Sequence, residues 1–236
     1  MSNYNNYRRK SYSRGKRRYS KRKRSRGFYL PSGTEVYILD ILPYGHIDRS
    51  KSRTGKPIVQ AIECPGFNLF EMSYDKDQEI EMQEKITVKN KPGTKLGKVL
   101  KRLNYHGLTQ TSKELLSSTI QMHLEDQEDR YVKILNNAGP ITKKRHSLSL
   151  LPGIGEKIMW KIIEERRKNN FESYQDFNER ISVNNIKEIF SKRILNEIID
   201  DEFKHYLFAT RKRNKGQQKS RSRKSRSNYN RRSRRR

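Results

Sequence analysis

The hydrophobic and polar positions divide the chain into a strand-rich first half and a helical second half. Between residues 33 and 89, short apolar runs with partial alternation are separated by polar turns that contain Gly or Pro, a pattern typical of short β-strands. Several such strands favour a small β-barrel, OB-like as the first choice and SH3-like as the alternative. The predicted strands are GTEVYILDIL (33–42), IVQAIE (58–63), NLFEMS (68–73) and EKITVK (84–89).

From residue 95 onward, apolar residues recur at the spacing of an amphipathic helix, beginning with LGKVLKRL at 96–103. Thr111 or Ser112 is the predicted cap of the next helix. GPITKKRHS (139–147) is predicted to be a basic loop. The further predicted helices are 112–127, 128–138, a short and a longer helix within 148–169, 171–181 and 185–203. The fold class is therefore α+β, with an OB-like barrel over 33–95 and a helical domain over 96–209.

The charge is concentrated at the two ends of the chain. Of 54 Lys and Arg residues, 12 lie in residues 1–27 and 14 in residues 210–236, and neither end carries an acidic residue. The remaining 28–209 holds 28 basic and 26 acidic residues, so the body is close to neutral. The ends lack apolar residues to bury, which predicts disordered basic arms. Tyrosines interleaved with these bases favour stacking on nucleic acid, with a solubility or targeting tail as the alternative.

Several classes of protein are disfavoured by composition. Cys64 is the only cysteine, so neither an intrachain disulfide nor a cysteine-rich zinc site is expected. No apolar run reaches the ~18 residues of a spanning helix, and the N-terminal sequence lacks the apolar segment of a signal peptide. We expect a cytoplasmic protein with no membrane association and no cofactor.

The stretch LLPGIGEKIMW (150–160) is the strongest local motif. Its two glycines allow a tight turn, and a helix that begins there presents unpaired amides and the positive end of its dipole to an anion. Pro-Gly-apolar-Gly followed by Lys resembles a helix-hairpin-helix, which grips the backbone of nucleic acid; a helix–helix corner used only for packing is the alternative. The residues predicted to act there are Leu151, Gly153, Ile154, Gly155 and Lys157.

Two basic loops complete the predicted nucleic-acid interface. Lys143, Lys144 and Arg145 precede the glycine turn. In the barrel, the loop at 43–57 lies where such barrels often receive nucleic acid, although a solvated loop is an equal interpretation. Its candidate residues are Arg49, Lys51, Arg53 and Lys56.

Other candidate residues carry weaker signals. His46 stands in a polar loop and is not expected to be catalytic. Trp160 shares helical spacing with Ile158, Ile162 and Ile163 and is expected in the core. An alternating acidic stretch suits either a metal site or a solvated edge that discourages aggregation. Its residues are Asp75, Asp77, Glu79, Glu81 and Glu84.

The segment 136–181 resembles the archaeal DUF655 family, and so do EVYILDILPYGH (35–46), PIVQAIE (57–63), FNLFEM (67–72) and LNYHGLTQTSKELL (103–116). The resemblance covers about 34–185 and leaves out the basic arms. It implies an OB-like barrel, a helix-hairpin-helix and an RNA- or nucleotide-binding role, but no established reaction. Family genes often lie beside one for an rRNA dimethyladenosine transferase, which favours RNA and ribosome or rRNA metabolism.

Three functions from different classes follow. The favoured one is a non-enzymatic RNA-binding protein whose hairpin, barrel and arms contact the phosphate backbone. The second is a DNA-binding or DNA-repair accessory protein, although Asp176 stands where a new helix starts rather than in a glycosylase context. The third is a metal-dependent nuclease that uses the acidic stretch. The sequence leaves the oligomeric state open.

Overall fold

The structure is a computed structural model that describes residues 29–46, 55–89, 93–143, 145–183, 185–200 and 203–210. The predicted basic arms, 1–27 and 210–236, lie outside the described residues except for Thr210. Within the described part of the chain, no helix has both the length and the apolar character that crossing a membrane requires.

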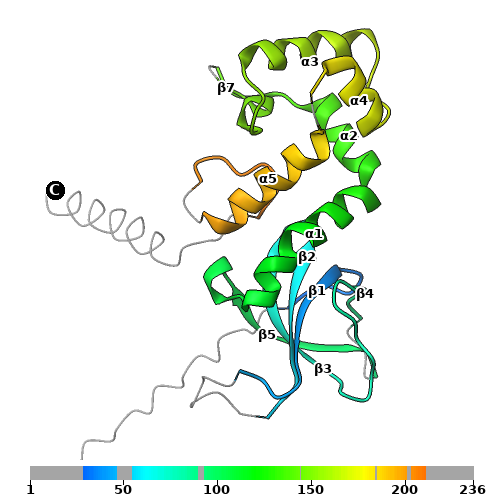
Figure 1. Ribbon diagram of the computed structural model, residues 1–236, viewed down its shortest axis with the longest axis vertical. Coiled ribbons are helices and arrows are strands. Elements are labelled where there is room, and N and C mark those ends of the chain that lie inside the picture. Colours follow the sequence, from blue (N-terminus) through cyan, green and yellow to red (C-terminus); the bar gives the residue numbers. More distant parts are fainter. Residues whose placement is uncertain are drawn as a thin grey trace, which may run out of the picture.

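A five-stranded antiparallel sheet forms the first half, and four of its strands lie in the stretches predicted to be strands (Figure 1). Its strands follow the order β4-β1-β2-β3-β5, and no pairing joins β4 to β5 in the part of the chain that the structure describes. The sheet is therefore open between these two edge strands. The strands are β1 (Glu35–Leu42), β2 (Ile58–Cys64), β3 (Asn68–Tyr74), β4 (Lys85–Thr87) and β5 (Leu96–Leu103).

The helix predicted at 96–103 is wrong, because this segment is strand β5 and pairs with β3. The register between β3 and β5 shifts at two places. These irregularities break the simple alternation of a strand, so Leu96 and Leu103 are buried while Leu100 is largely exposed. The resulting spacing of apolar residues imitates a helix.

Five α-helices and two short 3₁₀ helices make up most of the second half of the chain, as far as the structure describes it. The first α-helix begins at Gln110, and its cap is Thr109 rather than the predicted Thr111 or Ser112. The predicted basic loop at 139–147 is wrong in part, because it forms a two-stranded hairpin. The elements are η1 (Tyr105–Gly107), α1 (Gln110–Asp126), α2 (Glu128–Asn137), β6 (Pro140–Thr142), β7 (Arg145–His146), η2 (Ser147–Leu150), α3 (Glu156–Lys168), α4 (Tyr174–Ile181) and α5 (Ile186–Ile199).

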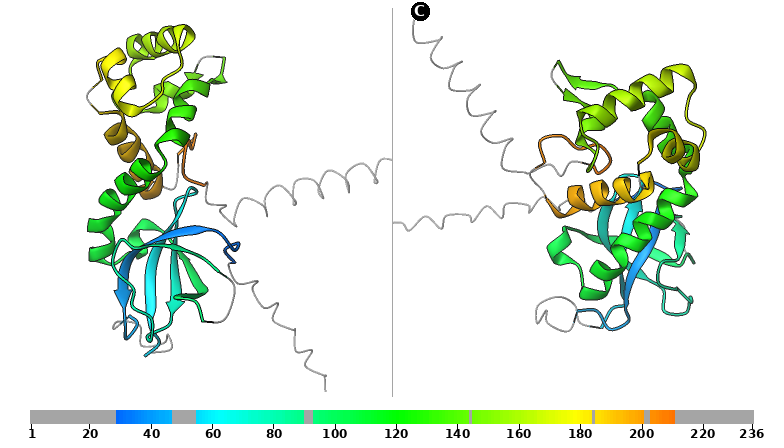
Figure 2. Two further views of the ribbon diagram at one scale, coloured as in Figure 1. Left: turned by 90° about the vertical axis from the view of Figure 1, so that its right-hand side faces the viewer. Right: turned by 45° about the horizontal axis from the view of Figure 1, so that its top comes forward.

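One hydrophobic core connects the sheet to the helices. Helix α1 packs against β1, and α5 packs along α1. Tyr37, Leu39 and Ile62 contribute the sheet side of this core, whereas Val36 and Ile38, which alternate with them, belong to a second cluster on the opposite face. Strands β1 and β2 are thus buried on both faces. Helices α2, α3 and α4 continue away from the sheet, so that α3 lies at the far end of the molecule (Figures 1 and 2).

A buried polar network fixes the start of α1 on the sheet. The Thr109 hydroxyl caps the helix by accepting from the Ser112 amide, and it donates to Asp40 Oδ2 at 2.6 Å. The Gln60 side-chain oxygen accepts from the Thr109 amide at 2.9 Å and from the Ser112 hydroxyl at 2.8 Å. Because these polar groups are satisfied by one another, the network orients α1, and with it the helices that follow.

Candidate nucleic-acid interface

The Pro-Gly-Ile-Gly turn joins η2 to α3 at the end of the molecule away from the sheet (Figure 1). Leu151 and Ile154 are buried in the main core, so the prediction that they point inward is confirmed. Gly153 has a φ of +80°, a left-handed conformation that glycine adopts without strain. The turn is therefore anchored by its apolar residues and shaped by Gly153.

The first turn of α3 is exposed and has no side-chain cap. Gly155 is the N-cap residue, and its carbonyl accepts the Met159 amide at 2.9 Å. The amides that precede Met159 in the helix have no intrahelical acceptor, and among the described residues none of them donates to another group. Helices α1, α4 and α5, by contrast, are capped by the side chains of Thr109, Ser173 and Asn185.

Charges at the two ends of α3 suit its dipole only in part. Arg166, Arg167 and Lys168 lie in the last turn, where cations are stabilised. In the first turn, Lys157 adds a positive charge, whereas Glu156 is an acid that competes with an external anion. The start of α3 is thus a weakly positive surface with free amides.

His146 and Ser147 hold η2 in place. His146 Nδ1 accepts from the Leu148 amide at 3.2 Å, and the Ser147 amide and hydroxyl both donate to the Gly139 carbonyl. Burial, together with the charge of Arg166, lowers the pKa of His146. A neutral imidazole keeps Nδ1 available as an acceptor, so this cap persists at neutral pH.

The β6–β7 hairpin leads directly into η2 and carries part of the predicted basic loop. Lys143 and Arg145 are exposed at its turn and on β7, and Lys144 lies outside the described residues. Ile141 on β6 is also exposed. Residues 143 and 145 therefore stand on a hairpin that η2 joins to the glycine turn.

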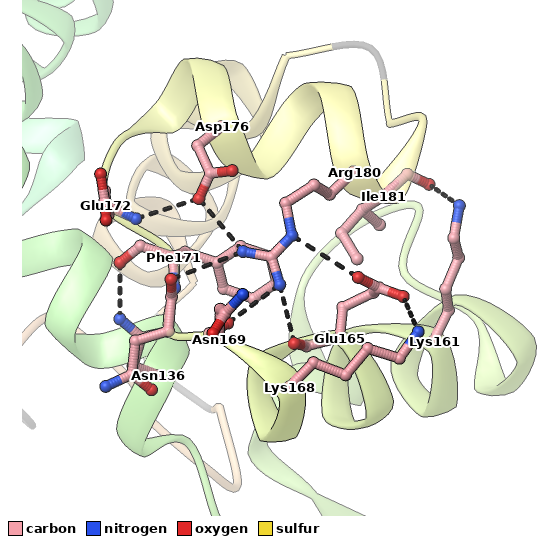
Figure 3. Close-up of polar contacts among 11 residues, drawn as sticks. Asn136, Lys161, Glu165, Lys168, Asn169, Phe171, Glu172, Asp176, Arg180 and Ile181 are labelled. Atoms are coloured by element: carbon pink, nitrogen blue, oxygen red, sulfur yellow. Dashed lines mark hydrogen bonds and ion pairs between the residues drawn. The ribbon is translucent and has the colours of Figure 1, made fainter.

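The end of α3 is locked to α4 by Arg180 (Figure 3). One terminal nitrogen of Arg180 donates to the carbonyls of Glu165 at 2.7 Å and Asn169 at 2.9 Å. The other contacts Asp176 Oδ2 at 3.2 Å, and the guanidinium lies 4.4 Å from the centre of the Phe171 ring. The hydrogen bond from Lys168 and the charge of Arg180 lower the pKa of Glu165. Arg180 is thus a structural residue that sets the direction of α3.

Arg180→Lys is expected to lower the free energy of unfolding by about 2 kcal/mol. Lysine keeps the charge but cannot donate to two backbone carbonyls and stack on Phe171 at the same time, and hydrogen bonds to charged groups contribute about 1.5–3 kcal/mol. Urea unfolding of the purified chain measures this loss. Arg167→Lys, at an exposed position on α3, is the matched control; equal stability of the two variants would remove Arg180 from this role.

The predicted basic residues do not all lie on one surface. Lys56 is exposed just before β2, and the start of β2 lies at the end of the sheet opposite to α3 (Figure 1). Arg49, Lys51 and Arg53 lie outside the described residues. The residues at 143–157 and the residues before β2 therefore form two separate candidate contact areas.

The prediction that Trp160 belongs to the core is wrong, because 52% of its surface is exposed. The buried stripe of α3 consists of Met159, Ile162 and Ile163. Trp160 is rotated by about 100° from Met159 on the helix, which turns its side chain toward solvent. Its sequence spacing to Ile163 suggested the core, and the position of the buried stripe could not be read from spacing alone.

The weaker candidates have structural partners. Glu84 pairs with Lys95 at 2.6 Å, and the Asp75 carboxylate accepts the Asp77 amide. Asp176 accepts the Glu172 amide and pairs with Arg180. Among the described residues, no group of three His, Cys, Asp or Glu side chains could hold a metal ion.

His46 has a buried partner. Its Nε2 lies 2.6 Å from the carboxylate of Glu71 on β3, so the polar loop is tied to the sheet at this point.

Comparison with known proteins gives one consistent family. Residues 32–210 match the family model described as protein of unknown function (DUF655). An uncharacterized protein of Methanocaldococcus jannaschii, MJ0038, is 40% identical over 174 residues, which cover 73% of this chain and 78% of the relative. The crystal structure of Af1531 from Archaeoglobus fulgidus, described with the same family, shares 33% identity and a TM-score of 0.69; the match covers 75% of this chain and 99% of that one.

Proposed function

We propose that this chain, which belongs to the DUF655 family, is a non-enzymatic nucleic-acid-binding protein of the cytoplasm that prefers RNA. In this proposal the segment 148–168 is a helix-hairpin-helix that holds the phosphate backbone, and the five-stranded sheet is an open OB-like barrel. The basic arms add affinity that depends on salt. Ribosomal RNA or its precursor is the proposed partner.

One observation carries the proposal: the exposed first turn of α3 combines a glycine N-cap, amides without acceptors among the described residues, and Lys157. A helix start of this kind binds phosphate through backbone groups and needs no base-specific side chain. RNA is favoured over DNA because tyrosines interleaved with arginines in the arms suit exposed bases. Backbone contacts of this type position a strand rather than read its sequence.

Gly155→Ala is expected to weaken RNA binding by about tenfold or more and to leave the fold intact. Gly155 has an ordinary φ of −76°, and nothing lies within 4 Å of an added Cβ. The methyl group would occupy the space beside the free amides, and losing one hydrogen bond to a charged group costs about 1.5–3 kcal/mol. Fluorescence anisotropy of a labelled RNA measures the change.

Two further variants sharpen this test. Gly139→Ala is the matched control, because an added Cβ there also meets nothing within 4 Å. Glu156→Gln removes the acid of the first turn and is expected to strengthen binding. If Gly155→Ala binds as the unaltered protein does, with both proteins folded, phosphate does not bind at the start of α3.

The contribution of the arms is separated by comparing the full chain with a 29–210 fragment at several salt concentrations. The Archaeoglobus protein is matched over 99% of its length by 75% of this chain, so a folded body of this size is expected to be stable alone. Affinity for a single strand should fall with salt with a logarithmic slope of about −0.7 per neutralised phosphate, and about −0.9 for duplex DNA. A fragment that binds RNA with a shallower slope supports the proposal; a preference for duplex DNA, or no binding, contradicts it.

A further inference from the structure

Trp160 is the only tryptophan of the chain, and it stands half exposed on the outer face of α3. An exposed tryptophan forgoes the large stabilisation that its burial would give. The same helix buries Met159, Ile162 and Ile163, so apolar positions for a large side chain exist nearby. This position therefore leaves a flat aromatic surface open to solvent at the end of the molecule.

Trp160 lies one turn after the start of α3. Trp160 follows Glu156 by four residues, a rise of about 6 Å along the helix axis. Helical side chains tilt toward the N-terminus, so the side chain of Trp160 is directed toward the turn that carries the free amides. Lys157 stands three residues earlier on the same side of the helix. A single nucleotide can bridge this separation between its phosphate and its base.

The charge of this face is complementary to a phosphate backbone. Three basic residues and two acidic residues share the outer face of α3 with Trp160. They are Lys157, Lys161 and Arg167, against Glu156 and Glu164, whereas Lys168 is paired with Glu165 at 2.7 Å. The two acids lie one turn before and one turn after Trp160, and the excess of basic residues outweighs them. Lys143 and Arg145 on the preceding hairpin contribute further positive charge.

We propose that Trp160 is a stacking platform for an unpaired base of a single-stranded RNA whose phosphate lies at the start of α3. This inference rests on the proposed function and narrows it to single strands. In a duplex, each base is already stacked and paired, so its face is not available to an aromatic side chain. Single-stranded nucleic acids, in contrast, are commonly held by base–aromatic stacking within a basic surface.

The fluorescence of Trp160 tests the proposal in the full chain, because emission from a single tryptophan reports on this position alone. An end-labelled single-stranded RNA and the blunt duplex of the same sequence are titrated in parallel. Anisotropy of the label measures binding, and tryptophan emission measures stacking in the same sample. We expect the single strand to quench the emission strongly and the duplex to quench it little.

The outcomes separate the two proposals. If the single strand binds and the emission of Trp160 stays unchanged, the stacking proposal is overturned and the proposed function stands. If the anisotropy shows no binding of either nucleic acid, the proposed function itself fails. Equal quenching by strand and duplex also overturns the stacking proposal, because it would indicate proximity without selectivity for unpaired bases.

Substitution gives a second, independent readout. Trp160→Ala is expected to weaken single-strand binding by about tenfold to a hundredfold, the range of one base–aromatic stack, and to leave duplex binding unchanged. Trp160→Phe should retain much of the affinity. Met122→Ala, at another exposed apolar position on a helix, is the matched control. An equal loss for strand and duplex, with the fold intact by circular dichroism, overturns the proposal.

Discussion

Glu197→Ala is expected to lower the free energy of unfolding by about 3–5 kcal/mol, the range for removing one partner of a buried ion pair. Glu197 is only 2% exposed, and Arg193 Nε donates to its carboxylate at 2.7 Å. The same carboxylate accepts three consecutive backbone amides beyond the end of α5. These amides belong to Leu207, Phe208 and Ala209. Removing the carboxylate leaves a buried cation and three donors without their acceptor.

Glu197→Ala should destabilise the segment next to α5 locally, in addition to lowering the global free energy of unfolding. Arg193 also donates to the His205 carbonyl at 2.7 Å and stacks on Phe203, so the pair fastens the whole described segment 203–210 to α5. Hydrogen exchange at residues 207–209 should accelerate in the variant before the chain unfolds globally. The measurement combines urea unfolding with exchange detected by mass spectrometry.

Glu188→Ala is the matched control, because Glu188 is an exposed acid on the same helix. Its effect should stay below about 1 kcal/mol, as for other exposed charges. Should Glu197→Ala unfold at the same urea concentration as the control, the pair is not a major contributor to stability. The Thr210 amide also donates to the Gly66 carbonyl at 2.9 Å, so the described segment 203–210 is tied to the turn between β2 and β3 as well as to α5.

The parts of the fold that depend on local signals were predictable from the sequence. The predicted strands at 33–42, 58–63 and 68–73 correspond to β1, β2 and β3. Each consists of a short apolar run bounded by turn residues, so the signal and the element occupy the same stretch of chain. Helices α2 and α3 are likewise confirmed, because their apolar spacing and their flanking turns agree.

The errors occur where a pairing partner or a packing partner, rather than the local apolar pattern, decides the structure. Strand β5 is fixed by its bulged pairing with β3, and the β6–β7 hairpin by pairing within a short basic sequence. In both cases the hydrogen-bond partner, rather than the local pattern, selects the strand conformation. Trp160 was misplaced for a related reason, because its exposure depends on which side of α3 meets the core.

In the candidate interface, too, some features follow from the local sequence and others depend on partners elsewhere in the chain. The inward direction of Leu151 and Ile154 follows from their spacing around the glycines and is confirmed. The residues that hold this turn in place were not found from the sequence. Arg180 reaches the end of α3 from 15 residues away, and Asn136 donates to and accepts from Phe171 across 35 residues. Isolated polar residues of this kind carry no periodic signal, so only the folded chain shows their partners.

The stability of the protein is expected to fall by about 3 kcal/mol as the pH is lowered from 6.5 to 4, because of His123 on α1. This histidine is 2% exposed, and within the described residues neither ring nitrogen has a hydrogen-bond partner. The rings of Tyr37, Phe67 and Tyr131 surround it edge-on at 5.6–5.9 Å. Burial, together with the charge of Arg130, lowers the pKa of His123 from 6.5 to about 4.

The direction of this pH dependence follows from the protonation of His123 in the folded and in the unfolded chain. Between pH 6.5 and 4 the unfolded chain binds a proton at His123 and the folded chain does not, so acid favours unfolding. The contribution of neutral His123 to the free energy of unfolding is complete above pH 6.5, declines between pH 6.5 and 4, and is lost below pH 4. A difference between pKa values of 6.5 and about 4 corresponds to about 3 kcal/mol.

His123→Leu should remove this pH dependence, because leucine keeps the site apolar and cannot bind a proton. Urea unfolding at intervals between pH 4 and 7 gives the difference in stability between the variant and the unaltered protein, in which the other titrating groups cancel. The difference should grow in favour of the variant as the pH falls. His106→Leu, at an exposed position on η1, should leave the pH dependence unchanged. Parallel curves for His123→Leu and the unaltered protein would show that His123 takes up its proton equally well in the folded chain, and that its burial among the three aromatic rings does not hold it neutral.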